Sequence, residues 1–395
     1  MLRIEAFGEF SKLKTPFYYY DIELLRRTAD HVAALAEKYG ISVHYAAKAN
    51  PSERIVRELC ARGFGVDCVS GAEVLLAAGC GVPAGKIFFA GVGKSDREIE
   101  AALETGIGAF NCESLQELEV INEMALAKGV KANVAIRVNP DVDAHTHRYI
   151  TTGLSENKFG ISAREFDRVI SQIKASEGIA FAGLQFHIGS QISDIGNIAM
   201  AECAKVNEIV AYFESRGLRV DSIDLGGGLG VDYDDPDGNP VPDFKTWFET
   251  IAAHLQRRED QSVHVEPGRS LVAQCGSLIA KALFVKNGET KDFLILDAGM
   301  NDLMRPALYG AYHKIENLSA YYGRGIEGTG CKYDVVGPVC ESSDVFGEQR
   351  ELAPSRRGDL IAIRSAGAYG ASMASRYNLR DIAPAVFSDE IVKFA

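Results

Sequence analysis

Several side chains that could do chemistry stand at the ends of short apolar runs in this 395-residue sequence. Lys48 directly follows one such run, His187 closes another, and Glu266 closes a third. Three adjacent glycines (226–228) follow a fourth run, and glycines let backbone N–H groups approach an anion closely. A lysine amine can form a Schiff base, and a carboxylate can stabilise a nearby cation. The set indicates a site for a phosphorylated ligand.

The runs that carry these residues are predicted to be eight strands. Several of them, such as IFFA and VAIRV, are continuously apolar, as expected for parallel strands covered on both faces. S-x-x-E capping boxes at Ser95, Ser114 and Ser162 predict helices between strands. The expected strands are 43–47, 65–69, 87–90, 107–111, 133–138, 181–187, 222–225 and 262–266. Eight strand–helix alternations over roughly 250 residues predict an α/β fold, a (β/α)8 TIM-like barrel; a doubly wound sheet is the alternative.

In such a barrel the catalytic groups lie at the carboxyl ends of the strands. The residues expected there are, in chain order, Lys48, Arg137, Asn139, His187, the glycines 226–228, Glu266, Gly268 and Arg269. Barrels often bind phosphate at the loops after strands seven and eight, where the glycines and Gly268-Arg269 fall. After about residue 275 the sequence changes to strand-like runs separated by Gly, Pro and Asp, which predicts a C-terminal β domain.

A lysine at a phosphate site suggests pyridoxal 5'-phosphate as the ligand, with Lys48 forming the Schiff base. Glu266 would pair with the pyridine nitrogen. At ~4 Å and an effective dielectric of ~20, that pairing contributes about 4 kcal/mol, or roughly 3 pKa units, so the ring stays protonated. Taken singly, Lys48 could be a surface lysine, Glu266 a structural ion-pair partner, His187 a core histidine and the glycines a turn. A dinucleotide site is disfavoured because Val231 replaces the third glycine of GxGxxG.

No metal site is expected. His145 and His147 have no third ligand nearby in the sequence, and the acidic stretch 232–239 lacks the first aspartate and closing glutamate of a calcium loop, so it is interpreted as a solvated loop. The eight cysteines form no CxxC pair and are interpreted as reduced thiols.

The charge balance excludes several partners. Lys and Arg number 42 against 54 Asp and Glu, a net charge of −12, which argues against binding to nucleic acid or to a membrane surface. The stretch MLRIEAFGEF has no long apolar run behind basic residues, so we expect no signal peptide, and no apolar stretch is long enough to span a bilayer. We therefore expect a cytoplasmic enzyme that acts on a small molecule.

Longer motifs extend these observations. They are HYAAKANP (44–51), GVDCVSGAE (65–73), NKFGI (157–161), FHIGSQ (186–191), DLGGGLG (224–230), EPGRSLVA (266–273), RPALYGAYH (305–313), GPVCESSD (337–344) and AGAYG (366–370). In these motifs the sequence resembles the group IV, fold-type III pyridoxal-phosphate decarboxylases, with the fold of alanine racemase and ornithine decarboxylase. RPALYGAYH and EPGRSLVA resemble the branch that acts on diaminopimelate. The resemblance runs from Thr15 to Tyr377, beyond which LRDIAPAVFSDE departs from the family pattern.

The resemblance implies a cofactor-binding barrel over residues 25–275. It also implies a β domain made of residues 1–24 and 276–395, in a homodimer with shared active sites. Lys48 would carry the cofactor, His187 would stack on its ring, and Glu266 would contact the pyridine nitrogen. The other cofactor-binding residues that it implies are Asp67, Arg137, Ser190, Gly226, Gly227, Gly228, Gly268, Arg269 and Tyr369.

The implied reaction is decarboxylation of meso-2,6-diaminopimelate to L-lysine and CO2, the last step of lysine biosynthesis. Arg269, Arg305 and Tyr309 would bind the distal carboxylate, because guanidinium groups suit a carboxylate better than an amine. Glu341 of the partner subunit would bind the distal ammonium group, and Tyr369 would touch the phosphate and the substrate. Cys340 of the partner subunit would donate the proton that replaces CO2.

The sequence also allows three alternative functions. One is a decarboxylase of the same fold that acts on another basic amino acid, although an acidic residue in place of Arg305 would then be favoured. Another is an enzyme like alanine racemase, for which a carboxylate at the pyridine nitrogen is unfavourable. The third is a non-catalytic cofactor-binding homologue, and the joint presence of Lys48, Glu266 and Cys340 argues against it.

Overall fold

A computed structural model describes residues 4–140, 158–326 and 330–391 of the chain. The chain divides into two compact units. The barrel unit comprises Thr28–Gly230 and Asp243–Gly268. The sheet unit comprises Met1–Arg27, Val231–Pro242 and Arg269–Ala395. His145 and His147, considered above as metal ligands, lie outside the described residues.

The barrel unit is a closed parallel barrel, so the doubly wound alternative is wrong and the barrel prediction is confirmed. Its first and last strands pair with each other, with Ser42 opposite His264. The strands, in order around the barrel, are β2 (Ser42–Ala46), β3 (Gly65–Cys68), β4 (Ile87–Phe89), β5 (Ala109–Cys112), β6 (Ala132–Arg137), β7 (Ile179–Gln185), β8 (Ser222–Asp224) and β9 (Ser262–Val265). Each lies within two residues of an expected strand.

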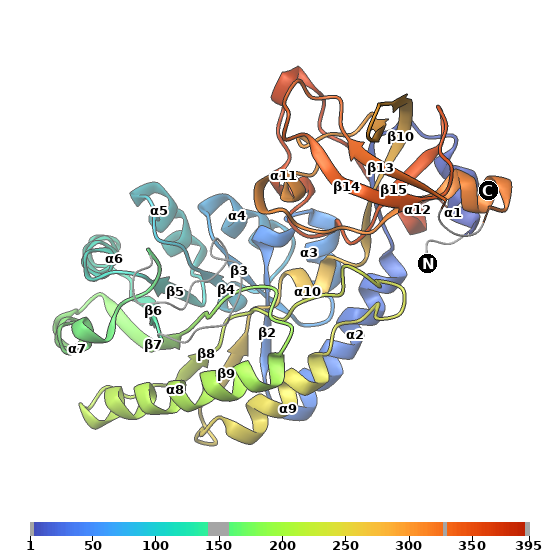
Figure 1. The fold of residues 1–395 in the computed structure, drawn as a ribbon. Helices are drawn as coiled ribbons and strands as arrows, with labels where there is room; N and C mark the ends of the chain where they lie inside the picture. The colour runs from blue at the N-terminus through green and yellow to red at the C-terminus, as the bar shows by residue number, and fades with distance from the viewer. Residues whose placement is uncertain (1–3, 141–157, 327–329, 392–395) are drawn as a thin grey trace. The chain divides into compact units, whose positions relative to one another are not determined.

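Helices connect the strands and surround the barrel (Figure 1). They are α3 (Glu53–Cys60), α4 (Gly71–Gly79), α5 (Asp96–Thr105), α6 (Leu115–Lys128), α7 (Phe166–Ala175), α8 (Ile195–Ser215) and α9 (Phe244–His254), with α2 (Ile22–Tyr39) before β2. The predicted capping box at Ser95 is present, and the Ser114 hydroxyl accepts the Glu117 N–H. At Ser162 the box does not form, and a short 3-10 turn precedes α7.

The sheet unit contains an eight-stranded sheet, confirming the predicted β-rich region. Its main path runs β12 (Ile315–Asn317), β15 (Leu360–Ile363), β10 (Gly276–Asn287), β11 (Asp292–Leu296), β13 (Cys331–Val336) and β14 (Val345–Leu352). The N-terminal strand β1 (Phe17–Tyr20) pairs with β10 and with β16 (Ala385–Phe387). The first residues of the chain therefore belong to this sheet. Short helices α1 (Ile4–Phe10), α10 (Arg269–Val272), α11 (Arg305–Tyr309) and α12 (Ser388–Ile391) accompany it.

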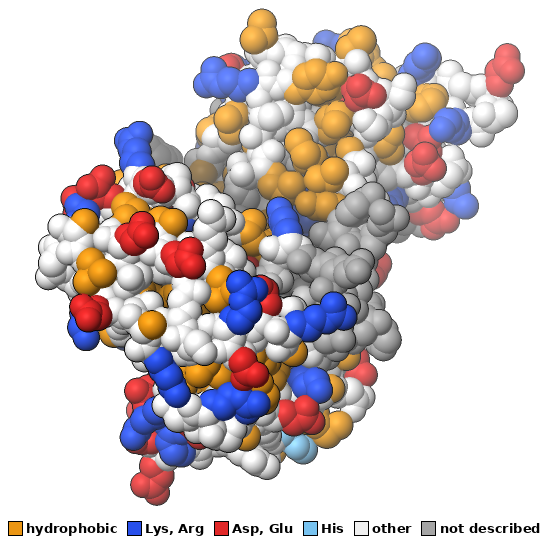
Figure 2. Space-filling model, turned by 90° about the vertical axis from the view of Figure 1, so that its left-hand side faces the viewer, with side chains coloured by type: hydrophobic (Ala, Val, Ile, Leu, Met, Phe, Trp, Pro, Cys, Tyr) orange, Lys and Arg blue, Asp and Glu red, His pale blue; other side chains and the backbone are white. Residues whose placement is uncertain are grey.

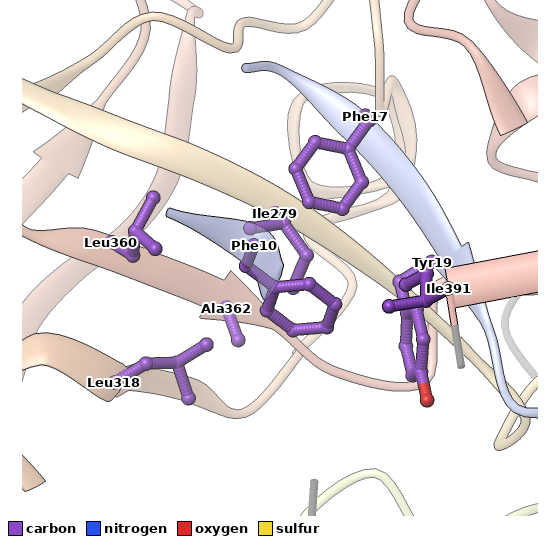
Figure 3. Packing of buried hydrophobic residues seen from close by; sticks show 8 residues of the cluster. All are labelled: Phe10, Phe17, Tyr19, Ile279, Leu318, Leu360, Ala362 and Ile391. Carbon is purple, nitrogen blue, oxygen red and sulfur yellow. The ribbon is translucent and has the colours of Figure 1, made fainter. Parts of the chain in front are cut away.

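An apolar cluster joins the two ends of the chain within the sheet unit. The Phe10 ring packs edge-on against Tyr19 at 4.8 Å and against Phe17 at 5.4 Å. Figure 3 shows these rings beside Ile279 of β10 and Ile391 of α12. Because the cluster takes residues from both termini, burial of apolar surface favours closing the sheet unit around β10.

The surface carries charges of both signs. On the face shown in Figure 2, Lys and Arg side chains lie among Asp and Glu side chains, and hydrophobic side chains gather on its upper part. In the described part of the chain, no helix combines the length and the apolar character needed to cross a membrane.

Candidate active site

Lys48 lies in the turn Ala47–Ala49 that follows β2, as expected for a residue at the carboxyl end of a barrel strand. Its Nζ is 3.8 Å from Oδ2 of Asp67 on β3, and the Asp67 side chain is 1% exposed. Neither oxygen of Asp67 accepts a hydrogen bond from the described residues. Burial raises the pKa of Asp67, and the Lys48 charge opposes that shift. The structure thus places an amine beside a buried carboxyl that has capacity for a further donor.

Glu266 follows β9 and is buried. Its carboxyl accepts a hydrogen bond from Gln185 Nε2 at 3.0 Å, and Asn111 Nδ2 lies 3.5 Å from its other oxygen. The pKa of Glu266 is raised well above its usual value, mainly by burial and secondly by the charge of the neighbouring Asp224. Asp224 ends β8, and its carboxyl accepts the Gly226 N–H at 2.9 Å. Burial raises the pKa of Asp224 to about 7.

His187 follows β7, and its Nδ1 accepts the N–H of Gly227 at 3.3 Å. The pKa of His187 is lowered well below its usual value. Burial is the main cause, and the positive charges of Lys48 and Arg137 add to it. The ring is therefore neutral, with its proton on Nε2. A neutral, flat ring is suited to stacking on an aromatic ligand. Ser190 lies in the loop beyond it and is half-buried.

The glycines after β8 are required by close backbone contacts. A Cβ on Gly227 would lie 2.3 Å from the carbonyl oxygen of Glu266, and one on Gly226 would lie 2.4 Å from that of Phe186. The N–H groups of Gly226 and Gly227 are used by Asp224 and His187. Gly228 has a φ of +133°, and its N–H makes no hydrogen bond to the described residues, so it can serve an anion.

Arg137 ends β6 and is held in place by the loops around it. Its Nη1 donates to Oε1 of Glu113 at 2.9 Å, and its guanidinium lies 4.7 Å from the Phe159 ring. Glu113 also accepts the N–H groups of Gly91 and Gly160. This network explains the NKFGI motif, because Phe159 covers the guanidinium and Gly160 binds its carboxylate partner.

In the sheet unit, Arg269 and Arg305 are both buried. Nη1 of Arg269 donates to the Tyr233 oxygen at 2.7 Å, and the Arg305 guanidinium lies 4.8 Å from the Tyr233 ring. Burial, together with the charge of Arg269, lowers the pKa of Arg305. Two buried guanidinium groups that repel each other form a place suited to an anion.

Tyr369 and Tyr309 accompany these arginines. The Tyr369 ring lies 5.0 Å from the Arg269 guanidinium, and its backbone has a φ of +55°, an unfavourable conformation for a tyrosine. Tyr309 closes α11, the helix that Arg305 opens, and is half-buried. Tyr309 and Arg305 therefore lie on the same short helix of the sheet unit.

Cys340 and Glu341 are exposed on the loop between β13 and β14. The buried Asp344 fixes this loop by accepting the N–H of Val339 at 2.7 Å and that of Met300 at 2.6 Å. The Cys340 N–H donates to Oδ1 of Asn378 at 2.9 Å. The loop is thus firmly held while its thiol and carboxylate point to the exterior.

Several residues that hold the predicted site residues in place were not predicted from the sequence. Tyr233 belongs to the stretch interpreted as a solvated loop, yet it is buried. His313, Asp224, Gln185 and Glu113 were not assigned roles either. Val231 and Tyr233 are alternate apolar residues in an otherwise acidic stretch, and this was the signal that one side of the loop is buried.

Comparison with known proteins places this geometry in a family. Residues 23–273 match the family described as pyridoxal-dependent decarboxylase, pyridoxal binding domain. The diaminopimelate decarboxylase of Bacteroides thetaiotaomicron is 54% identical over 393 residues, covering 99% of this chain and all of that protein. That of Neisseria meningitidis is 41% identical, covering 98% of this chain and 91% of its own.

Solved structures of similar proteins lead to the same family. Diaminopimelate decarboxylase from Helicobacter pylori complexed with L-lysine matches with a TM-score of 0.90 and 38% identity, covering 98% of this chain and 94% of that one. A lysine/ornithine decarboxylase from Vibrio vulnificus matches at 24% identity and shows the fold alone. The chain therefore belongs to the pyridoxal-dependent decarboxylases and, within them, to the diaminopimelate decarboxylase family. Its cofactor is pyridoxal phosphate.

The residues of the barrel unit fit this cofactor. Lys48 supplies the amine, and the Asp67 carboxyl beside it has no hydrogen-bond donor among the described residues. Gly228 offers a backbone N–H at the loop where a phosphate is expected. Glu266 supplies a buried carboxyl, and His187 supplies a neutral ring. An aldehyde, a phosphate, a pyridine nitrogen and a ring face would thus each meet a suitable group.

Proposed function

We propose that this protein decarboxylates meso-2,6-diaminopimelate to L-lysine and CO2. This is the activity for which its relatives, the diaminopimelate decarboxylases, are named. The observation that carries this proposal is the pair of buried guanidinium groups, Arg269 and Arg305, that share Tyr233. The substrate loses a carboxylate at one end, and two arginines that bind its other end require a second carboxylate there. The substrate must therefore have two carboxylates. Diaminopimelate has them, whereas ornithine and arginine do not.

The barrel unit would provide the cofactor site. Pyridoxal phosphate, when bound, supplies an electron sink for the electron pair that the departing carboxylate leaves behind. Lys48 would hold it through its amine, with Asp67 keeping that amine in place, and Glu266 would hold the pyridine nitrogen. The residues that would hold the phosphate are Ser190, Gly228, Gly268 and Tyr369. Gly226 and Gly227 would instead shape the turn, because their N–H groups bind Asp224 and His187. Arg137 would support the site through its pairing with Glu113.

His187 would cover the ring face and keep water from the reacting carbon. Because its Nδ1 is used by Gly227 and its charge is suppressed, it would pack without adding a positive charge to the site. In the sheet unit, Arg269, Arg305 and Tyr309 would bind the retained carboxylate. They would orient the substrate so that its other end reacts.

The proton donor would be Cys340 of a second subunit. We assign the protein to a homodimer with shared active sites, in which Glu341 of the partner subunit binds the distal ammonium group. The support for both assignments is the exposed, firmly held loop on which the two residues lie. Cys340→Ala should leave the cofactor bound but slow or misdirect protonation, with Cys331→Ala as the control. Unchanged turnover and product would refute this role.

The experiment that tests the proposed function offers four substrates to cofactor-loaded protein. These are meso-diaminopimelate, its LL isomer, ornithine and arginine, with CO2 release and lysine formation followed for each. Release from the meso isomer alone, with L-lysine as product, is expected. Release from ornithine or arginine would overturn the role of the arginine pair, and release from none would favour a non-catalytic homologue.

A further inference from the structure

We propose that Tyr233 and His313 are positioning residues that orient Arg269 and Arg305 as one receptor for the retained carboxylate of the ligand. This inference rests on the proposed function and deepens it. Its basis is that both residues bind the guanidinium groups as neutral acceptors, which fixes the geometry of the two arginines and, at Arg305, leaves the guanidinium charge for the ligand.

Tyr233 contacts both arginines with one side chain. Its oxygen accepts a hydrogen bond from Nη1 of Arg269 at 2.7 Å. The face of its ring lies 4.8 Å from the guanidinium carbon of Arg305. The side chain is 8% exposed, so it is fixed by packing as well as by these contacts. A change in its position would move the two guanidinium groups together.

His313 fixes Arg305 from another side. Its Nδ1 lies 2.8 Å from the carbonyl oxygen of Arg364 and so must carry the proton. Its Nε2 is then an acceptor and receives Nη1 of Arg305 at 2.7 Å. The ring is fully buried and meets Tyr233 edge-on at 5.0 Å. Burial, and then the charge of Arg305, lower the pKa of His313 to about 3, so it remains a neutral acceptor.

The neutral character of Tyr233 and His313 matters, because a carboxylate in either position would neutralise the guanidinium group that it binds. Arg305 forms no ion pair with any carboxylate in the described ranges. Arg364, which directly follows β15, shows the contrasting arrangement, since its guanidinium binds Asp237 at 2.9 Å and Glu316 at 2.7 Å. A buried guanidinium held only by neutral acceptors is stabilised strongly by an incoming anion.

Arg364 also connects the two positioning residues. Its side chain holds Asp237, which lies in the same segment as Tyr233, and its carbonyl oxygen holds His313. The segment Val231–Pro242 is further fixed because Gln274 binds the carbonyl oxygen of Asn239. Arg364 thus helps to fix both Tyr233, through the segment that contains Asp237, and His313.

The test uses cofactor-loaded protein and two ligands that differ in the carboxylate. L-lysine has a carboxylate, and cadaverine is the same diamine without it. Tyr233→Phe removes the hydroxyl group but keeps the ring, and it should weaken lysine affinity about tenfold with cadaverine affinity unchanged. KM for meso-diaminopimelate should rise similarly while kcat stays within about threefold. Tyr312→Phe, an exposed tyrosine beside His313, is the matched control.

A second pair of variants tests His313. His313→Gln retains an acceptor and should keep most of the lysine affinity, whereas His313→Leu should lose it as Tyr233→Phe does. Equal losses for lysine and cadaverine, or unchanged lysine affinity in both Tyr233→Phe and His313→Leu, would overturn the inference. If the wild-type protein binds lysine in this Tyr233-dependent way but releases no CO2 from meso-diaminopimelate, the receptor is supported and the proposed function fails.

Discussion

Lys48 and Asp67 illustrate how single residues prepare the barrel for its cofactor. The Lys48 side chain is 39% exposed, whereas the Asp67 side chain, 3.8 Å away, is 1% exposed. A buried carboxylate favours the charged form of a nearby amine, and it also restricts where that amine can lie. The pair therefore keeps the amine at the barrel mouth rather than in solvent.

Replacement of Lys48 tests this assignment. Lys48→Ala should abolish decarboxylation and remove the visible absorbance of protein-bound cofactor after dialysis, because no amine remains to hold the aldehyde carbon. Lys205→Ala on the exposed face of α8 is the control. An absorbance spectrum like that of the wild type in the dialysed variant would show that another amine holds the cofactor.

Asp224 should make the cofactor-free protein sensitive to pH. Its folded-state pKa of about 7 is above the usual 3.8, so folding favours its protonated form. The free energy of unfolding should then fall as pH rises from 3.8 to about 7. Asp224→Asn keeps an acceptor for Gly226 and should stabilise the protein by up to about 4 kcal/mol near pH 8, with little effect near pH 4.

Thermal unfolding at several pH values measures this effect. Asp221→Asn, an exposed residue just before β8, is the control. If Asp224→Asn destabilises the cofactor-free protein equally at every pH, the Asp224 carboxyl is ionised in the folded state and its pKa is not raised by burial.

At the scale of elements, the loop between β13 and β14 presents Cys340 and Glu341 through one buried acid. Asp344→Ala would leave the N–H groups of Val339 and Met300 without acceptors. Such losses cost about 1–3 kcal/mol each, so the loop would no longer be held. We expect kcat to fall about tenfold or more with cofactor affinity unchanged, because the cofactor residues lie on other elements. Glu348→Ala on β14 is the control, and an unchanged kcat would contradict the assigned loop role.

The barrel strands could be predicted from the sequence because their residues are buried on both faces. The runs IFFA and VAIRV contain no polar alternation, and the observed β4 and β6 fall inside or beside them. The residues at the strand ends could then be assigned to one mouth by the geometry of barrels. The capping box expected at Ser162 fails because the chain there forms a 3-10 turn instead.

Residues that act through contacts distant in sequence could not be predicted. Tyr233 meets Arg269 and Arg305, and Asp237 meets Arg364, across long stretches of chain. A single sequence has no periodicity that encodes such pairs. The acidic composition around Tyr233 also favoured a solvated loop, and only the fold shows that Asp237 is neutralised by a buried arginine.

At the scale of the whole molecule, the proposed homodimer makes a quantitative prediction. Lys48→Ala and Cys340→Ala chains, each nearly inactive alone, are mixed, dissociated and allowed to reassociate. If each site takes Lys48 from one chain and Cys340 from the other, mixed dimers contain one intact site. Random pairing then restores about a quarter of the wild-type activity. Recovery no greater than the sum of the two variants would show that the sites are not shared.

In the proposed reaction, the arginine pair holds one carboxylate of the substrate while the carbon at the other end loses CO2 and gains one proton. The most direct measurement is the decarboxylation of meso-diaminopimelate in D2O, with the product examined by NMR and mass spectrometry. We expect L-lysine with a single deuterium on the ε carbon and none on the α carbon. Lysine labelled at the α carbon, or no lysine at all, would contradict the proposed reaction.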